Sequence, residues 1–178
     1  MNGRDRIRTT LAFQEPDRPP HFESMFELEH EAFGVRFPDR HSWSGISTEE
    51  KRCKIDCCMK IYARIIERFD WDALMVFWPW SDPDGVREAQ RQFGDRIMVG
   101  APVGGGLWAI ENVDDWTQFS VDLFENRGKL HEEAERRCQS AFGSIDRLTD
   151  AGADFIFLAH DVAFNGGPFI KPEYFQEL

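Results

Sequence analysis

The pattern of apolar and polar residues alternates between helical spacing and short apolar runs. Apolar residues recur at helical spacing over residues 47–69 and 129–150, which predicts two long amphipathic helices. Continuous apolar runs predict strands that are covered on both faces, and they lie at residues 72–77, 96–100 and 155–159. Buried strands that alternate with helices predict an α/β fold built from parallel β/α units.

Other elements are predicted from boundary residues. Ser47 followed by Glu50 forms a capping-box pattern at the start of the first long helix. Asn112 is predicted to cap a further helix. Residues 3–13 predict a short N-terminal amphipathic helix, and residues 19–25 are a weakly patterned candidate for the first strand. His21 and Glu23 in that segment are candidate pocket residues, and the alternative is an ordinary half-exposed strand with the same alternation.

The residues that follow the run at 155–159 are candidates for catalysis. In parallel α/β folds, ligand sites lie at the carboxyl ends of the strands. His160 and Asp161 occupy that position, so we predict that both line a pocket and that Asp161 orients a ligand or acts as a general acid. The alternative is that Asp161 caps the turn at Asn165-Gly166 through the side-chain bonds that aspartate often makes.

A second group of residues is predicted to bind substrate. Tryptophans at strand ends suit a flat ring, and a neighbouring carboxylate suits a polar anchor. An alternative for the Trp78 and Trp80 pair is that it seals the top of a core. Glycines 104–106 lack both the Walker and the dinucleotide-binding patterns, so they predict a pocket wall rather than a phosphate site. The predicted substrate-binding residues are Glu23, Trp78, Trp80, Asp82, Gly105, Trp108 and Gly167.

Composition narrows the class of protein. The chain has 178 residues, of which 42% are hydrophobic, and this favours a single globular domain. A net charge of -11 argues against nucleic-acid binding. No apolar run approaches the roughly 20 residues of a membrane span, so we expect a cytoplasmic protein. The cysteines lack metal-binding spacing, so we predict that they are packing residues. We predict that Arg4, Arg6 and Arg8 form a solvated helix face rather than an anion site.

Two stretches carry a resemblance to a known family. Residues 151–172 and the helix start after them resemble the "GADGI…DD…GG(P)…SPE.F" signature of the uroporphyrinogen decarboxylase-like family. The opening, from Arg4-Asp5-Arg6 to Pro20, is similar to that family's "R.R…A….PDR.P" start. Lys171 stands where the family has serine, and His160 where it often has the first aspartate. The matching positions of the second stretch are Gly152, Ala153, Asp154, Asp161, Gly167, Pro172, Glu173 and Phe175.

The resemblance implies a TIM (β/α)8 barrel. Such a barrel needs about 250 residues as a rule, and about four strands fit here. We therefore expect residues 1–178 to be one partial domain, the N-terminal half of a barrel preceded by a helix. The expected partners are the missing half-barrel or a homodimer mate.

The resemblance also implies two chemistries. One is cofactor-free decarboxylation of the acetate arms of a tetrapyrrole, and the other is methyl transfer between corrinoid proteins and thiols through zinc. The decarboxylase's "RQAGR" segment is replaced by His21-Phe22-Glu23-Ser24, which favours the methyltransferase type.

Other expected residues of the family are not matched cleanly. In the decarboxylase, the strand that corresponds to residues 72–77 ends in an aspartate implicated in pyrrole protonation. No residue of this chain aligns cleanly with that aspartate, and Asp82 is only the nearest candidate. Zinc ligands are implied only in the missing half, so no metal ligand or cofactor is assigned to this chain. The alternatives are porphyrin-biosynthetic decarboxylation, a non-catalytic half-barrel that binds a tetrapyrrole or a partner chain, and an inactive gene remnant.

Overall fold

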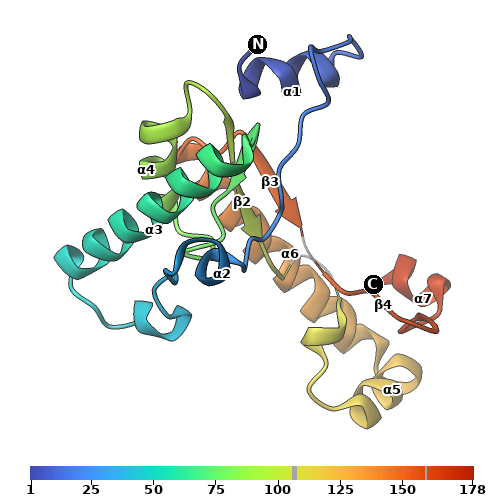
Figure 1. Ribbon diagram of the computed structural model, residues 1–178. Helices are drawn as coiled ribbons and strands as arrows, with labels where there is room; N and C mark the ends of the chain where they lie inside the picture. Colours follow the sequence, from blue (N-terminus) through green and yellow to red (C-terminus); the bar gives the residue numbers. More distant parts are fainter. Residues whose placement is uncertain (106–107, 159) are drawn as a thin grey trace. The chain divides into compact units, whose positions relative to one another are not determined.

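The computed structural model describes residues 1–105, 108–158 and 160–178, and these form a mixed α/β structure (Figure 1). Two compact units are present: unit 1 comprises residues 1–102 and 147–157, and unit 2 comprises residues 103–146 and 158–178. The elements are α1 (Gly3–Leu11), α2 (Glu29–Phe33), η1 (Arg40–Trp43), α3 (Thr48–Phe69), β1 (Ala73–Met75), α4 (Pro83–Phe93), β2 (Met98–Val103), η2 (Ile110–Asn112), α5 (Trp116–Glu125), α6 (Arg127–Asp150), β3 (Phe155–Leu158), β4 (Ala163–Phe164), β5 (Gly167–Pro168) and α7 (Pro172–Glu177).

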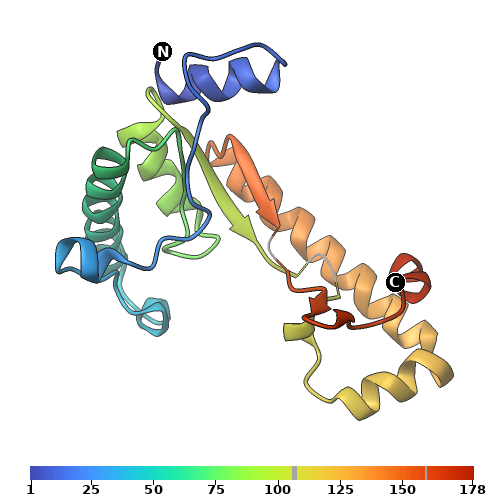
Figure 2. The same cartoon turned by 45° about the vertical axis from the view of Figure 1, so that its right-hand side comes forward.

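The three longer strands form a parallel sheet in the order β1-β2-β3. Ala73 lies opposite Met98 and Met75 lies opposite Gly100. Helices α3 and α4 lie side by side, on the same side of β2 (Figure 2). The α/β class and the parallel β/α units are therefore confirmed, while closure into a barrel stays a prediction.

Helix α3 forms as its sequence pattern predicts. Ser47 Oγ accepts a hydrogen bond from the backbone N–H of Glu50 at 3.2 Å, which satisfies one of the free donors at the helix start. The apolar side of the helix packs into the core of unit 1, where Met59 and Ile65 are fully buried. Burial of this apolar face stabilises the helix more than its intrinsic propensity does.

The prediction of a strand at residues 19–25 is wrong. Among the described residues, this segment makes one backbone–backbone hydrogen bond, from Asp72 N to His21 O at 3.0 Å. Pro19 and Pro20 have no N–H to give, and the N–H of His21 bonds instead to the carboxylate of Asp72 at 2.8 Å. The first half of the segment therefore offers no backbone N–H to a neighbouring strand.

The prediction that Asn112 caps a helix is also wrong, because Asp115 caps α5. Asp115 Oδ1 accepts hydrogen bonds from Thr117 N and Gln118 N at 2.9 and 3.0 Å. The side chain of Asn112 bonds instead to Ala109 N at 3.1 Å, within the short turn η2. A carboxylate is the stronger partner for the positive end of a helix.

The prediction that Arg4, Arg6 and Arg8 form a solvated face is confirmed for Arg8, which is exposed, but it is wrong for Arg6, and Arg4 is half-buried. Arg6 is buried, bonds Asp17 at 2.7 Å and also bonds the carboxylate of Asp72. Arg18 bonds the other oxygen of Asp72 at 2.7 Å and bonds Asp70 at 2.6 Å. We call these five residues the Asp72 cluster. Arg6 is buried and Arg18 is half-buried, and the carboxylates that they meet offset the cost of leaving water.

A second ion pair joins the two stretches that carry the family resemblance. The guanidinium of Arg4 donates to both carboxylate oxygens of Asp154, at 2.7 and 2.6 Å. Asp154 also accepts from Val99 N at 2.9 Å and from Gln90 Nε2 at 2.8 Å. One carboxylate therefore ties α1, α4, β2 and the start of β3 together within unit 1.

Strand β3 is only half buried, which corrects the prediction that it is covered on both faces. Leu158 is 52% exposed, and the predicted last residue of the run, Ala159, lies outside the described residues. The ring of Phe155 lies directly over Gly100 of the neighbouring strand. Because β3 is at the edge of the sheet, its apolar side chains have a neighbouring strand on one side only.

The cysteines behave differently from one another. Cys58 is buried in unit 1, and burial raises the pKa of its thiol to about 12. Cys53 and Cys57 are exposed, so the prediction of packing cysteines is wrong for these two.

No helix in the described part of the chain has the length and apolar composition that a membrane crossing requires.

Candidate functional site

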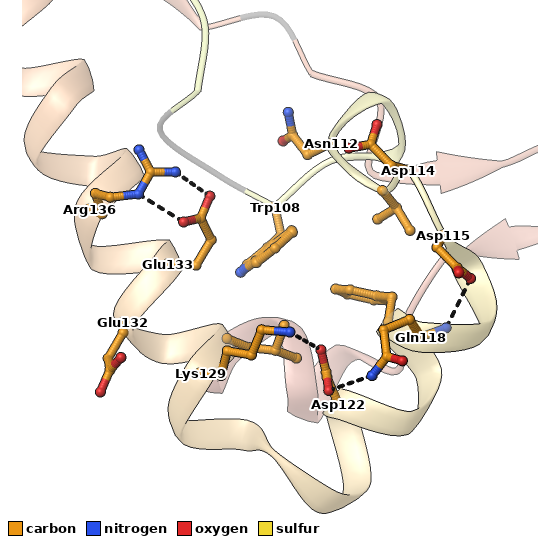
Figure 3. Close-up of a pocket in the computed structure, with 13 residues that line it drawn as sticks. Trp108, Asn112, Asp114, Asp115, Gln118, Asp122, Lys129, Glu132, Glu133 and Arg136 are labelled. Atoms are coloured by element: carbon orange, nitrogen blue, oxygen red, sulfur yellow. Dashed lines mark hydrogen bonds and ion pairs between the residues drawn. The ribbon is translucent and has the colours of Figure 1, made fainter.

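A cavity of about 450 Å³ opens in unit 2 (Figure 3). The segment before α5, helix α5 itself and the first half of α6 form its walls. Its apolar lining is Trp108, Val113, Phe119 and Leu130, and its polar lining is Asn112, Asp114, Asp115, Gln118, Asp122, Lys129, Glu132, Glu133 and Arg136.

Trp108 is the central aromatic side chain of this cavity. It is 8% exposed and belongs to the core of unit 2 with Phe119, Leu123, Leu130 and Ile170. Its ring lies 5.2 Å from that of Phe119, and the guanidinium of Arg137 lies 4.7 Å from its ring centre. Its indole N–H is buried and has no hydrogen-bond partner among the described residues. The predicted substrate-binding residue Trp108 thus lines a real cavity and holds an unused donor.

Some carboxylates of this cavity are neutralised inside it. Asp122 bonds Lys129 at 2.8 Å and Gln118 at 2.9 Å, and Glu133 bonds Arg136 at 2.6 Å (Figure 3). The bond from Lys129, followed by those from Asn126 and Gln118, holds the pKa of Asp122 below its usual range. Both carboxylates are therefore charged at neutral pH.

The remaining carboxylates of the cavity have no cation beside them. Asp114, Asp115 and Glu132 form no ion pair with any residue that the structure describes. Asp115 is partly compensated, because it caps α5. The cavity consequently carries an excess of negative charge beside an aromatic floor.

A second cavity, of about 580 Å³, is lined by the predicted residue Trp78 in unit 1. Phe26, Phe37, Glu29 and Arg36 also line it. Trp78 follows the carboxyl end of β1, and the other lining residues lie within residues 26–39.

The backbone of Trp78 is fixed by hydrogen bonds to the hydroxyl of Tyr62. Tyr62 Oη accepts from Trp78 N at 2.7 Å and donates to Trp78 O at 3.2 Å. Burial raises the pKa of Tyr62 well above its usual value, which keeps the hydroxyl protonated and able to donate. The indole of Trp78 therefore sits on a fixed backbone.

A third cavity of about 500 Å³ is lined by the predicted residue Glu23. Glu23 is exposed at its rim. The apolar wall consists of Phe22, Phe26, Leu28, Phe69 and Trp71. Phe26 packs edge-on against Trp71, with ring centres 5.8 Å apart.

Trp80 and Asp82 do not line the Trp78 cavity. Trp80 is 43% exposed and packs edge-on against Phe77 at 4.9 Å. Asp82 caps α4 by accepting from Asp84 N at 2.8 Å, and it pairs with Lys51 at 2.7 Å. These contacts assign Asp82 a structural role that the sequence analysis did not foresee.

The two predicted glycines differ in what surrounds them. Gly105 has a φ of +86° and nothing within 4 Å of the place where a side chain would begin. Its neighbours Gly106 and Leu107 lie outside the described residues. Gly167 has a φ of +143° and pairs with Phe164 in the β4–β5 hairpin, whose two-residue turn is Asn165-Gly166.

His160 makes a contact that the sequence analysis missed. Its Nδ1 lies 2.8 Å from Oε1 of Glu111, and its side chain is only 5% exposed. Burial raises the pKa of Glu111, but the bond to His160 and backbone bonds outweigh this, and the net pKa is lowered. An ionised carboxylate only accepts, so Nδ1 donates, and Nε2 is left buried without a partner among the described residues.

Asp161 is exposed. Its backbone carbonyl accepts from Ile110 N at 2.8 Å, which fixes the main chain. The predicted alternative, a cap on the Asn165-Gly166 turn, has no side-chain hydrogen bond to support it in the ranges that the structure describes. Neither His160 nor Asp161 lines one of the three cavities, so their catalytic role stays a prediction.

The side chains that could bind a metal ion are His, Cys, Asp and Glu. Within residues 1–105, 108–158 and 160–178, no group of three His, Cys, Asp or Glu side chains is arranged to hold a metal ion. The resemblance implies zinc ligands only in the missing half of the barrel, so zinc binding stays a prediction.

Comparisons with protein-family models, curated proteins and solved structures return no match. The family resemblance rests on the two stretches quoted above. The contacts of Arg4 and Asp154 are the structural context of those stretches.

Proposed function

We propose that this chain is a uroporphyrinogen decarboxylase-like protein of the type that transfers methyl groups between corrinoid proteins and thiols, rather than a decarboxylase. The observation that carries the proposal is the pair of hydrogen bonds from the guanidinium of Arg4 to the carboxylate of Asp154. These residues belong to the two resembling stretches and are 150 positions apart in the sequence. A chance resemblance at both ends has no reason to involve two residues that bond each other.

The charge of the cavities supports the choice between the two chemistries. Carboxylates outnumber cations in each of the three cavities that contain a predicted residue. The Trp78 cavity, for example, contains Glu27, Glu29 and Asp39 against Arg36. A tetrapyrrole with many carboxylates needs cations, as the electrostatics of its decarboxylation also require. A corrinoid with amide side arms lacks that charge.

The part of the reaction that we assign to this chain is binding. Trp78 offers an aromatic surface for the ring system at the carboxyl end of β1. Methyl transfer also needs a thiolate bound to zinc. The resemblance implies ligands for that zinc only in the missing half of the barrel, so we assign no step through the metal to this chain.

Titration calorimetry with methylcobalamin and with uroporphyrin III tests the proposal. We expect methylcobalamin to bind and uroporphyrin III to show no saturable heat. Trp78→Ala should weaken methylcobalamin binding about ten-fold, since removing a buried aromatic contact costs about 1–2 kcal/mol. Trp80→Ala is the matched control and should leave binding unchanged, because Trp80 lies on the same turn but outside the cavity.

Other outcomes distinguish the alternatives. Tighter binding of uroporphyrin III would reject the methyltransferase type in favour of decarboxylation. Binding of neither compound would reject a tetrapyrrole ligand and leave a partner chain as the proposed binding target.

A further inference from the structure

The unit 2 cavity combines three features that point to a ligand. It has an aromatic floor of Trp108 and Phe119, with ring centres 5.2 Å apart. It has carboxylates without a cation, Asp114 and Glu132, on opposite sides (Figure 3). It also holds a buried donor, the indole N–H of Trp108, for which the described residues supply no acceptor. We propose that this cavity binds an organic cation, a protonated amine attached to a flat apolar body that carries a hydrogen-bond acceptor.

The unpaired carboxylates determine the charge of the ligand. The described cations of the lining, Lys129 and Arg136, are already bonded to Asp122 and Glu133. An anionic ligand would therefore meet Asp114 and Glu132 without a free cation to compensate. A protonated amine is attracted by both carboxylates. The guanidinium beside Trp108, that of Arg137, is itself bonded to Glu133 at 2.7 Å.

The indole of Trp108 determines the second feature of the ligand. A buried N–H without a partner loses the hydrogen bond that it made to water in the unfolded chain. Figure 3 shows the indole nitrogen on the side of the ring toward Glu133 and Lys129. These two residues line the cavity, but both are bonded to other side chains. An acceptor on the ligand would satisfy the N–H.

The volume limits the size of the flat body. A space of about 450 Å³ admits a bicyclic ring with a short amine arm, and pockets for small molecules are usually of this size. The inference does not rest on the proposed corrinoid chemistry, because it concerns other residues in another unit of the chain.

Three matched compounds test the inference by titration calorimetry on the whole chain. 5-Methoxytryptamine carries the ring, the amine and an acceptor. 5-Methoxyindole-3-acetate replaces the cation with an anion, and tryptamine lacks the methoxy acceptor. We expect 5-methoxytryptamine to bind, tryptamine to bind about three- to ten-fold more weakly, and the acetate to bind at least ten-fold more weakly. Added salt should weaken binding of the amines.

Three variants locate the site. Asp114→Asn with Glu132→Gln should weaken 5-methoxytryptamine binding about ten-fold, from the loss of two attractive charges. Glu135→Gln is the control, an exposed carboxylate of α6 outside the cavity, and should change nothing. Trp108→Phe keeps the ring and removes the N–H, so it should abolish the preference for 5-methoxytryptamine over tryptamine.

The inference is overturned if the acetate binds as tightly as the amine, if neither amine shows saturable binding, or if Glu135→Gln weakens binding as much as the double variant. The carboxylate variants alter exposed side chains, so they remain informative should Trp108→Phe fail to fold. Circular dichroism of every variant checks that it is folded.

Discussion

Replacing Asp72 with alanine is expected to lower the free energy of unfolding by about 3–5 kcal/mol. Asp72 is 1% exposed and accepts hydrogen bonds from Arg6, from Arg18 at 2.7 Å and from His21 N at 2.8 Å. Without it, the buried guanidinium of Arg6 keeps Asp17 as its carboxylate partner but loses its buried one. Urea unfolding followed by circular dichroism measures the change.

Asp70→Ala is the matched control for this variant. Asp70 bonds the same Arg18 at 2.6 Å, but its side chain is 84% exposed. Exposed ion pairs contribute about 0–1 kcal/mol, and alanine at this left-handed position, with φ +50° at the end of α3, adds about 1 kcal/mol of strain, so this variant should lose about 1–2 kcal/mol. Equal losses for Asp70→Ala and Asp72→Ala would contradict the argument that burial, rather than pairing alone, sets the cost.

The same carboxylate makes the stability depend on pH. Burial tends to raise the pKa of Asp72, but the N–H of His21 and the guanidiniums of Arg18 and Arg6 outweigh it, so the net pKa is below the usual value. This stabilisation is therefore present above the unfolded pKa of about 3.9 and is lost as the pH falls through the folded pKa. The urea midpoint should drop below about pH 4, and it should drop less in Asp72→Asn.

The second large effect is expected for Gly100→Ala, which should destabilise unit 1 by about 2–3 kcal/mol through overpacking. A methyl group at Gly100 would lie 2.3 Å from the ring of Phe155, and an aromatic ring cannot bend away. Two strands of the sheet meet at this point, so the added atom forces them apart. The same urea measurement detects the loss.

A double-mutant cycle and one control test this explanation. In a Phe155→Leu background, Gly100→Ala should cost less than half as much, because the obstructing ring is gone. Gly128→Ala, in α6, has open space around the new methyl group and should be neutral or stabilise by about 0.5–1 kcal/mol. If Gly100→Ala costs as much without the ring, close packing on Phe155 is not its cause.

The candidate site was predictable only in part. Aromatic residues after strands indicated Trp78 and Trp108, and each of these does line a cavity. The partner of His160 was not predictable, because Glu111 is 49 positions away and no local spacing links the two. The sequence predicted a helix start near Asn112, but nothing in it indicated that the carboxylates of the cavity lining would outnumber their cations.

The sequence by itself determined the long helices and the strands of the parallel sheet, because apolar spacing and capping residues act over a few neighbouring positions. It predicted α3 from the pattern that begins at Ser47, and it predicted the three parallel strands. Only the tertiary structure decided which charged residues are buried. The sequence pattern predicts Arg6 as a surface residue, yet Arg6 is buried because it forms ion pairs with Asp17 and Asp72. A buried charge needs a partner, which the fold brings from elsewhere in the chain, and the local sequence pattern does not identify that partner.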